Sequence, residues 1–173
     1  MKFHERLRMV QRIFPDCRYH TNFGLADLPR FIKQYNVNMN PDYQRDYVWN
    51  IEQKKAFVGS AIQMPFNVPV FWFNNTDMED KDVQSEVVDG KQRMNAILGW
   101  LDGQFEAICP CGEIFHVNDI DEIGHRGLDL STTMSAKFVK LKRNDILKFY
   151  LMLNSGGTVH TKEELDRIRG MIK

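Results

Sequence analysis

The segment EVVDGKQRMNAILGWL, residues 86–101, combines the residue types best suited to bind an anion. An apolar run ends in Asp89, Gly90 permits a tight turn, and two basic residues stand where a helical pattern begins. The first turn of a helix offers free backbone N–H groups and the positive end of the helix dipole. Arg93 can grip two phosphate oxygens, Lys91 can add positive charge, and Gly90 lets a phosphate approach the backbone. The spacing therefore predicts a phosphate-binding turn.

Asp89 suggests that this turn does chemistry as well as binding. A carboxylate beside bound phosphates can hold Mg²⁺ or orient an attacking water or hydroxyl. In a simpler alternative, Asp89 only caps the helix and the basic side chains are solvated. Cations are disfavoured at a helix N-terminus, so Lys91 and Arg93 in that position indicate an anionic ligand. The turn is not a Walker A loop, because the chain contains no G-x-x-x-x-G-K-[ST].

A second polar cluster, DYQRDYVW, covers residues 42–49 and interleaves charged with aromatic residues. In a functional interpretation, Gln44 and Arg45 face a ligand while the aromatic residues pack behind them or stack on a base. In the alternative, the segment is a loop held to the core by its aromatic residues. That alternative explains Tyr47 and Trp49 equally well, and it is the favoured interpretation for Trp49.

The third cluster is LNSGGTVHT, residues 153–161. A Gly-Gly pair that follows a helix is typical of a C-cap and turn. In a functional interpretation, Asn154 and Ser155 also donate hydrogen bonds to a ligand that the glycines allow to come close.

The three cysteines are Cys17, Cys109 and Cys111. An odd number without a secretion signal argues against a disulfide framework. The Cys-Pro-Cys spacing is tighter than the Cys-x-x-Cys of a zinc knuckle, although His116 and His125 follow it. We expect thiols on a hairpin rather than a metal site.

Composition narrows the class of protein. With 173 residues, 43% hydrophobic and 27% charged, the chain is expected to be one globular domain over residues 1–173. It has neither an apolar run long enough to cross a membrane nor an apolar N-terminal signal, so we expect a cytoplasmic protein with no membrane partner. The net charge is zero, but residues 1–50 carry 8 basic and 5 acidic side chains and residues 136–173 carry 9 and 4. These ends could form one basic face for phosphates or intermix with acidic groups on a solvated surface.

Periodicity predicts alternating helices and strands with short connections, which indicates an α+β or α/β domain. Asn50 and Thr161 are expected helix N-caps, the latter with a capping-box glutamate at position 164. A helix capped by Asn144 is expected over 145–153. The remaining helices are predicted over 3–13, 25–35, 51–63 and 91–101; strands are predicted over 68–73, 86–88 and 138–141; a hairpin joins 104–108 to 113–117; and 118–136 is expected to be irregular.

The three clusters, in this order, resemble the DGQQR-type (DUF262) domains, the N-terminal domain type of GmrSD-like modification-dependent restriction enzymes in the ParB/sulfiredoxin-like superfamily. The matching stretches are PDYQRDYVW at 41–49, VDGKQR at 88–93 and LNSGGT at 153–158. The resemblance is strongest over 41–158 and implies an α+β fold, a small mixed sheet surrounded by helices in one compact domain. It also implies nucleotide-phosphate binding at the glycine-to-arginine core, with Mg²⁺ and a nucleoside triphosphate as cofactors.

Carried over by position, the resemblance implies catalytic roles for Asp89, Gln92 and Arg93, with Asp89 also the metal ligand. The expected nucleotide-binding residues around them are Gly90, Lys91, Gln44, Arg45, Asn154 and Ser155. One departure is Lys91, which stands where the family usually has glutamine and adds a positive charge.

The leading functional hypothesis is therefore an enzyme that hydrolyses a nucleoside triphosphate or transfers its terminal phosphoryl group, in a DNA-related setting such as phage defence, restriction or DNA modification. A short phage-encoded member would fit this pattern. No His-Asn-His constellation is visible, so we do not expect this chain alone to cleave DNA. Two alternatives stay open: a DNA-binding or DNA-nicking ParB-like module, and a non-catalytic interaction protein.

Overall fold

The computed structural model describes residues 3, 5–6, 17–64, 68, 70–120, 127–128, 132–154 and 161–172. In its central strands, buried and more exposed residues alternate. In β7 (Thr133–Val139), the side chains of Met134, Ala136 and Phe138 are buried, and the residues between them are more exposed. This period of two lets one face of a strand enter the core while the other faces outward.

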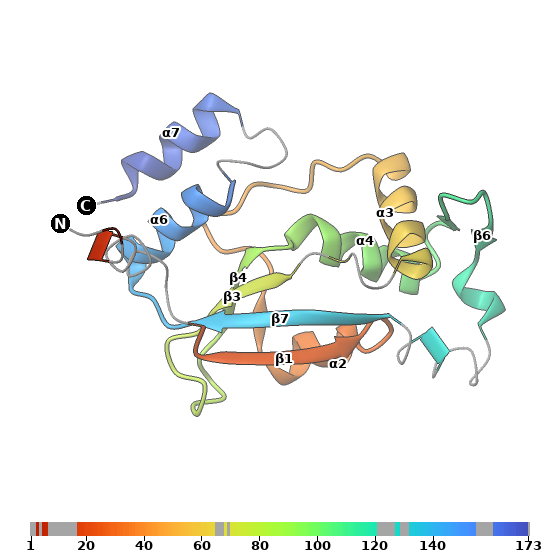
Figure 1. Cartoon of the computed structure of the whole chain (residues 1–173), viewed down its shortest axis with the longest axis horizontal. Helices are drawn as coiled ribbons and strands as arrows, with labels where there is room; N and C mark the ends of the chain where they lie inside the picture. Colours follow the sequence, from red (N-terminus) through yellow and green to blue (C-terminus); the bar gives the residue numbers. More distant parts are fainter. Residues whose placement is uncertain are drawn as a thin grey trace.

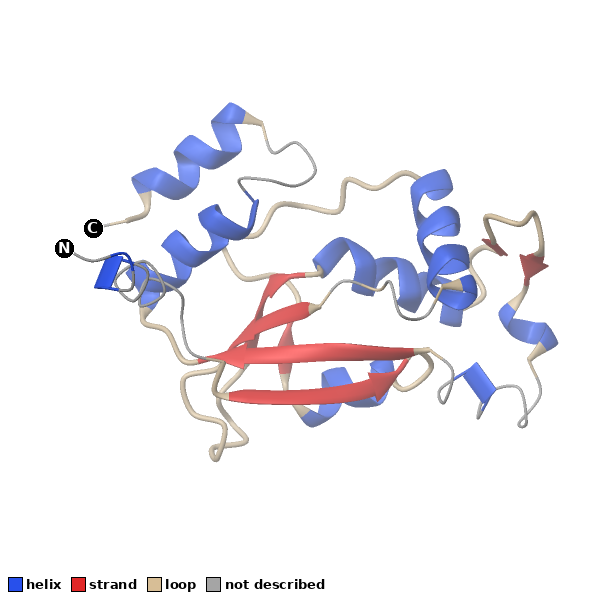
Figure 2. Cartoon of the chain, in the orientation of Figure 1, coloured by secondary structure: helices blue, strands red, loops and turns tan. Residues whose placement is uncertain are grey.

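The main sheet has five strands in the order β1-β7-β3-β4-β2. β1 (Tyr19–Gly24) runs antiparallel to β7, and β3 (Phe71–Asn74) runs parallel to β7. β4 (Ser85–Asp89) is antiparallel to β3 and parallel to the short β2 (Val37–Asn38). The strands therefore form a mixed sheet with helices around it (Figures 1 and 2). The expected α+β class, with a small mixed sheet in one compact domain, is confirmed.

The two faces of the sheet bury two separate clusters of side chains. Phe71, Phe73 and Val87 belong to the larger cluster. Of their chain neighbours, Val88 belongs to the smaller cluster and Trp72 packs against it. Because neighbouring residues of a strand point to opposite faces, the two clusters lie on opposite sides of β3 and β4.

The described residues form five α-helices of more than one turn around this sheet. α2 (Leu28–Gln34) and α4 (Lys91–Leu101) contribute to the larger cluster, whereas α6 (Arg143–Asn154) and α7 (Lys162–Gly170) contribute to the smaller one. α3 (Ile51–Gln63) packs on α4 and on the hairpin of β5 (Ala107–Ile108) and β6 (Ile114–Phe115). In Figure 1, α3 and the hairpin lie at one end of the molecule and α6 and α7 at the other.

Helix capping follows the sequence closely. Asn50 and Thr161 each form a capping box, in which the cap side chain accepts from the third helical N–H and that residue's side chain accepts from the cap N–H. Both predicted N-caps are confirmed. α6, however, begins at Arg143, so Asn144 lies inside the first turn instead of capping a helix at 145.

Two parts of the sheet differ from the sequence prediction. The strand expected at 138–141 is β7, and it spans Thr133–Val139, so the last residues expected to be irregular are in fact its first half. The polar residues Thr133, Ser135 and Lys137 occupy its outward positions and interrupt the apolar residues. A search for continuous apolar runs therefore does not detect the first half of this strand. β1 was not predicted, because Phe23 is the one apolar residue of this strand that is buried.

The helix predicted over residues 3–13 lies largely outside the described residues, as does much of the segment 118–131. No helix in the described part of the chain has the length and apolarity to cross a membrane.

Candidate functional site

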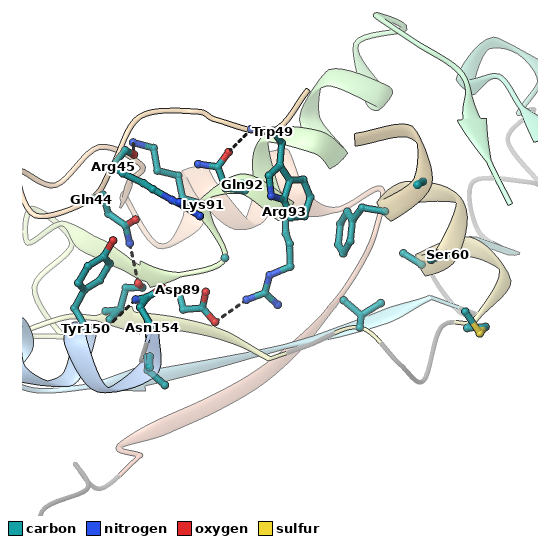
Figure 3. A pocket seen from close by; sticks show the side chains of 18 residues that line it. Gln44, Arg45, Trp49, Ser60, Asp89, Lys91, Gln92, Arg93, Tyr150 and Asn154 are labelled. Atoms are coloured by element: carbon teal, nitrogen blue, oxygen red, sulfur yellow. Dashed lines mark hydrogen bonds and ion pairs between the residues drawn. The ribbon is translucent and has the colours of Figure 1, made fainter. Parts of the chain in front are cut away.

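A cavity of about 600 Å³ opens where β4 ends and α4 begins. Its walls are the first turn of α4, the segment before α3, α3 itself and the end of α6. Figure 3 shows Tyr150 and Asn154 at one end, Ser60 at the opposite end, and Asp89 and Arg93 between them. The structure therefore brings described residues of all three sequence clusters to one place, with Leu153 and Asn154 representing the third.

Gly90 makes the turn between β4 and α4. Its φ is +113°, a conformation that side chains on an L-residue rarely adopt. A Cβ at this position would also lie 2.4 Å from Cδ1 of Phe71, which is fully buried. Both the backbone angle and the close approach therefore require glycine here.

Arg93 lies almost buried in the cavity wall, with 10% of its side chain exposed. Its Nη2 donates to Oδ2 of Asp89 over 2.7 Å, and the guanidinium stacks on the ring of Phe71, 4.8 Å from the ring centre. A longer contact joins the guanidinium to the carbonyl oxygen of Val70. These contacts hold the guanidinium in one orientation at the base of the cavity.

The other two residues of the first turn of α4 bind the segment Arg45–Trp49, here called the strap. Nζ of Lys91 donates to the carbonyl oxygen of Arg45 over 2.7 Å and lies 4.8 Å from the ring centre of Tyr47. Burial lowers the pKa of the Lys91 ammonium, an effect that nearby Asp46 opposes. Lys91 therefore has a structural task in addition to any contact with a ligand.

Gln92 bonds the strap along its length. Its Oε1 accepts from the backbone N–H of Val48 at 3.0 Å and of Trp49 at 3.4 Å, and its Nε2 donates to the carbonyl oxygen of Asp46 at 2.8 Å. These contacts favour a positioning role, whereas the catalytic role expected for Gln92 stays a prediction.

Gln44 and Arg45 line the cavity beside this turn, where the sequence predicted them. Nε2 of Gln44 donates to the carbonyl oxygens of Val87 and Val88, which ties the chain before the strap to β4. Nη1 of Arg45 lies 3.9 Å from Oε2 of Glu164, and its side chain is 14% exposed. The two groups form a long ion pair, and Arg45 also lines the cavity.

α6 supplies the polar end of the cavity. Burial raises the pKa of Tyr150 to about 12, while Arg45 opposes this shift and Glu164 adds to it. Nδ2 of Asn154 donates to the carbonyl oxygen of Tyr150 over 2.8 Å. Asn154 therefore lines the cavity as predicted, whereas Ser155 lies outside the described residues.

Sequence reasoning missed Tyr150 and, apart from Trp49, the contribution of α3 and its flanks. Small and apolar residues form this side of the cavity: Trp49, Ala56, Phe57, Ser60, Ala61, Met64 and Val68. Trp49 packs against the core, which is the favoured interpretation, and it also lines the cavity, whereas its stacking on a base stays a prediction. The alternation of aromatic and charged residues in the second cluster was the one sequence signal for this side of the cavity.

The charged residues that line the cavity are Arg45, Lys91 and Arg93 against Asp89, which sum to +2. Including Glu164, the partner of Arg45, leaves +1. A cavity of this size with a surplus of cationic residues in its lining suits an anionic small molecule.

Asp89 determines how well the site fits Mg²⁺. Its carboxylate is 39% exposed, with Oδ2 bonded to Arg93. The described residues contain no group of three or more His, Cys, Asp or Glu side chains placed to hold a metal. Mg²⁺ is commonly held by one or two carboxylates together with substrate phosphates, so Asp89 fits a Mg²⁺ ion that is bound jointly with a nucleotide.

The cysteine turn lies outside the cavity. Cys109 is buried with its Sγ 3.3 Å from the carbonyl oxygen of Gly59, and Cys111 is exposed. Burial raises the pKa of the Cys109 thiol. Both residues are free thiols on the β5–β6 hairpin, as the sequence predicted.

Comparison with known proteins gives one family. A family model described as the GmrSD restriction endonuclease, N-terminal domain, matches residues 27–167. Neither the curated proteins nor the solved structures contain a match to the chain. The matched range includes every described residue that lines the cavity.

Proposed function

The chain belongs to the family of GmrSD restriction endonuclease N-terminal domains, and from this premise we propose that it is a nucleotide-dependent enzyme of a DNA restriction system. In this proposal, the cavity binds a nucleoside triphosphate through its phosphates. The terminal phosphoryl group is then hydrolysed or transferred.

One observation carries the proposal: a nearly buried arginine faces a cavity in which cationic groups outnumber acidic ones. Burying a charge is costly unless it is paired or meets a ligand of opposite charge. Arg93 has its pair in Asp89, but Arg45 and Lys91 bring further positive charge to the same cavity. A polyanionic ligand would balance that surplus.

Phosphoryl transfer requires mainly positioning and charge neutralisation, which matches what these residues offer. Arg93 and Arg45 would bind phosphate oxygens, and the backbone N–H groups after Gly90 would add hydrogen bonds. Asp89 would orient the attacking oxygen. Mg²⁺, when bound through Asp89 and the phosphates, would supply further neutralisation of phosphate charge.

Lys91 and Gln92 would act through the strap. By bonding Arg45 and the residues after it, they fix the position of the Arg45 guanidinium relative to Arg93. We therefore assign both a positioning role, with direct contact to phosphate as an additional role for Lys91.

The first test is nucleotide binding and phosphate release with ATP, GTP, CTP and UTP in the presence of Mg²⁺. Arg93→Met removes the guanidinium and is expected to abolish binding and turnover. Arg169→Met is the matched control, because Arg169 pairs with Asp166 on α7 and does not line the cavity. Circular dichroism establishes that both variants are folded.

Normal nucleotide affinity in a folded Arg93→Met variant would overturn the proposed site. Arg45→Met provides an independent check, because Arg45 contacts the cavity from the strap rather than from α4. If the wild type binds none of the four nucleotides, the proposal as a whole is overturned.

DNA binding is the second candidate function, favoured by the restriction-endonuclease description of the family. If the chain binds DNA through phosphate contacts, its affinity should fall steeply as salt concentration rises, because condensed counterions are released on binding. Adding plain and modified DNA to the turnover assay tests this at the same time. Turnover that rises with DNA would indicate a DNA sensor, and turnover that ignores DNA would indicate a free-standing phosphotransferase.

A further inference from the structure

The cavity has two chemically different sides. Arg93, Arg45 and Asp89 supply charge at the turn before α4, and the α3 side is mostly apolar. Seven residues form that side: Trp49, Ala56, Phe57, Ser60, Ala61, Met64 and Val68. In Figure 3, Ser60 on α3 lies well apart from Tyr150 and Asn154, beyond Arg93.

A phosphate chain cannot use the apolar side, because burying an anion against apolar groups carries a large desolvation cost. A ligand that fills the whole cavity must therefore join an anionic group to a flat apolar group. Nucleotides have this construction.

We propose that the α3 side of the cavity is the nucleobase subsite of a nucleoside triphosphate whose phosphates lie at Arg93. This inference rests on the proposed function and specifies how the same cavity holds the rest of the ligand. The base stacks against the aromatic wall and lies over the small residues of α3.

The aromatic wall is the pair Trp49 and Phe57, whose ring centres are 5.4 Å apart with planes tilted by 58°. Trp49 is half-buried, packs against the core and has its backbone N–H bonded by Gln92. It is therefore held in place while part of its side chain lines the cavity. Aromatic side chains held in this way are suitable stacking surfaces for bases.

Ala56 and Ser60 have small side chains, which leave space on this side of the cavity. They stand four residues apart on α3, so they lie on one face of the helix one turn apart. Ala56 is exposed and Ser60 half-buried, so both have surface that a ligand can cover. A leucine at either position would occupy the space assigned to the base.

The test compares ATP with inorganic tripolyphosphate, which carries the phosphates without a base. Isothermal titration calorimetry on the full chain with Mg²⁺ gives both affinities. The wild type is expected to bind ATP at least about fivefold more tightly, which is the lower end of what stacking on an aromatic side chain contributes per base. Ser60→Leu and Ala56→Leu are expected to remove this preference and leave tripolyphosphate affinity unchanged.

Lys54→Leu is the control, because it adds a leucine to α3 at a residue that does not line the cavity. It is expected to preserve both affinities. Leucine is a strong helix former, so none of the three variants should disturb α3 itself.

Equal affinities for ATP and tripolyphosphate in the wild type would overturn the nucleobase subsite while leaving the phosphate site intact. ATP affinity that is unchanged in both Ser60→Leu and Ala56→Leu would do the same. Absence of binding by either ligand would overturn the proposed function and the subsite together.

Discussion

Replacing Gly90 by alanine tests the geometry on which the proposed phosphate site depends. The substitution places a Cβ 2.4 Å from Cδ1 of Phe71 and forces alanine to a φ of +113°. Gly112, in the β5–β6 turn, is the matched control: its φ is +94°, and no atom of the described residues lies within 4 Å of a Cβ built there. The two substitutions share the backbone penalty and differ in the collision.

The magnitude follows from these two terms. Left-handed backbone costs an L-residue about 1–2 kcal/mol, offset by the 0.4–1 kcal/mol gained because alanine restricts the unfolded chain. Gly112→Ala should therefore lower the free energy of unfolding by at most about 1.5 kcal/mol. Gly90→Ala must also displace the fully buried ring of Phe71, and overpacking of this kind costs about 1–3 kcal/mol more.

Urea denaturation of the two variants and the wild type measures this difference directly. Phe71 also carries the guanidinium of Arg93 on its ring, so nucleotide affinity should fall in Gly90→Ala and stay unchanged in Gly112→Ala. If the two variants lose equal stability, the approach of Phe71 is not what requires glycine. If Gly90→Ala binds nucleotide normally, the turn does not set the position of Arg93.

Two further predictions concern lysines that form hydrogen bonds between separate elements. Lys91→Met leaves the carbonyl oxygen of Arg45 without its charged donor, so it should lower the free energy of unfolding by about 1.5–3 kcal/mol. It should also raise the rate of amide hydrogen exchange in residues 45–49, and an unchanged rate there would contradict the role of Lys91 in holding the strap. The second pair is Lys55 and Glu106: the hydrogen bond and charge of Lys55 hold the pKa of Glu106 below its usual value. This pair therefore stabilises the protein fully at pH values above the pKa that Glu106 has in the unfolded chain. The stabilisation is lost as pH falls through the lower pKa that Glu106 has in the folded protein. Stability should therefore begin to drop as pH falls below the ordinary glutamate pKa of about 4.3, and equilibrium denaturation should show a smaller drop in Lys55→Met than in the wild type.

The sequence predicted the turn between β4 and α4 well because its signals are local. A strand end, a glycine and a helix start within a few residues leave little freedom for where Asp89 and Arg93 lie. The capping boxes at Asn50 and Thr161 were predictable for the same reason. Each depends on contacts between residues three positions apart.

What the sequence could not predict depends on long-range packing. Ala56 and Ser60 resemble residues of any solvated helix face, and only the packing of α3 on α4 places them in a cavity. β1 joins the sheet through β7, more than a hundred residues later, and its own residues carry almost no apolar pattern. The contacts of Lys91 with the strap also depend on the tertiary fold, because its position at a helix start pointed only toward an anion.

The first turn of α4 enters any binding event with its long side chains already ordered. Lys91, Gln92 and Arg93 each have partners within the protein: Lys91 and Gln92 bond the strap, and Arg93 bonds Asp89. Immobilising such a side chain on binding costs about 0.5–1.5 kcal/mol of rotamer entropy, and here most of that cost is incurred during folding. The turn is thus preorganised: it can discriminate sharply between ligands that differ by small displacements of their charge, because it cannot readily rearrange to accommodate them.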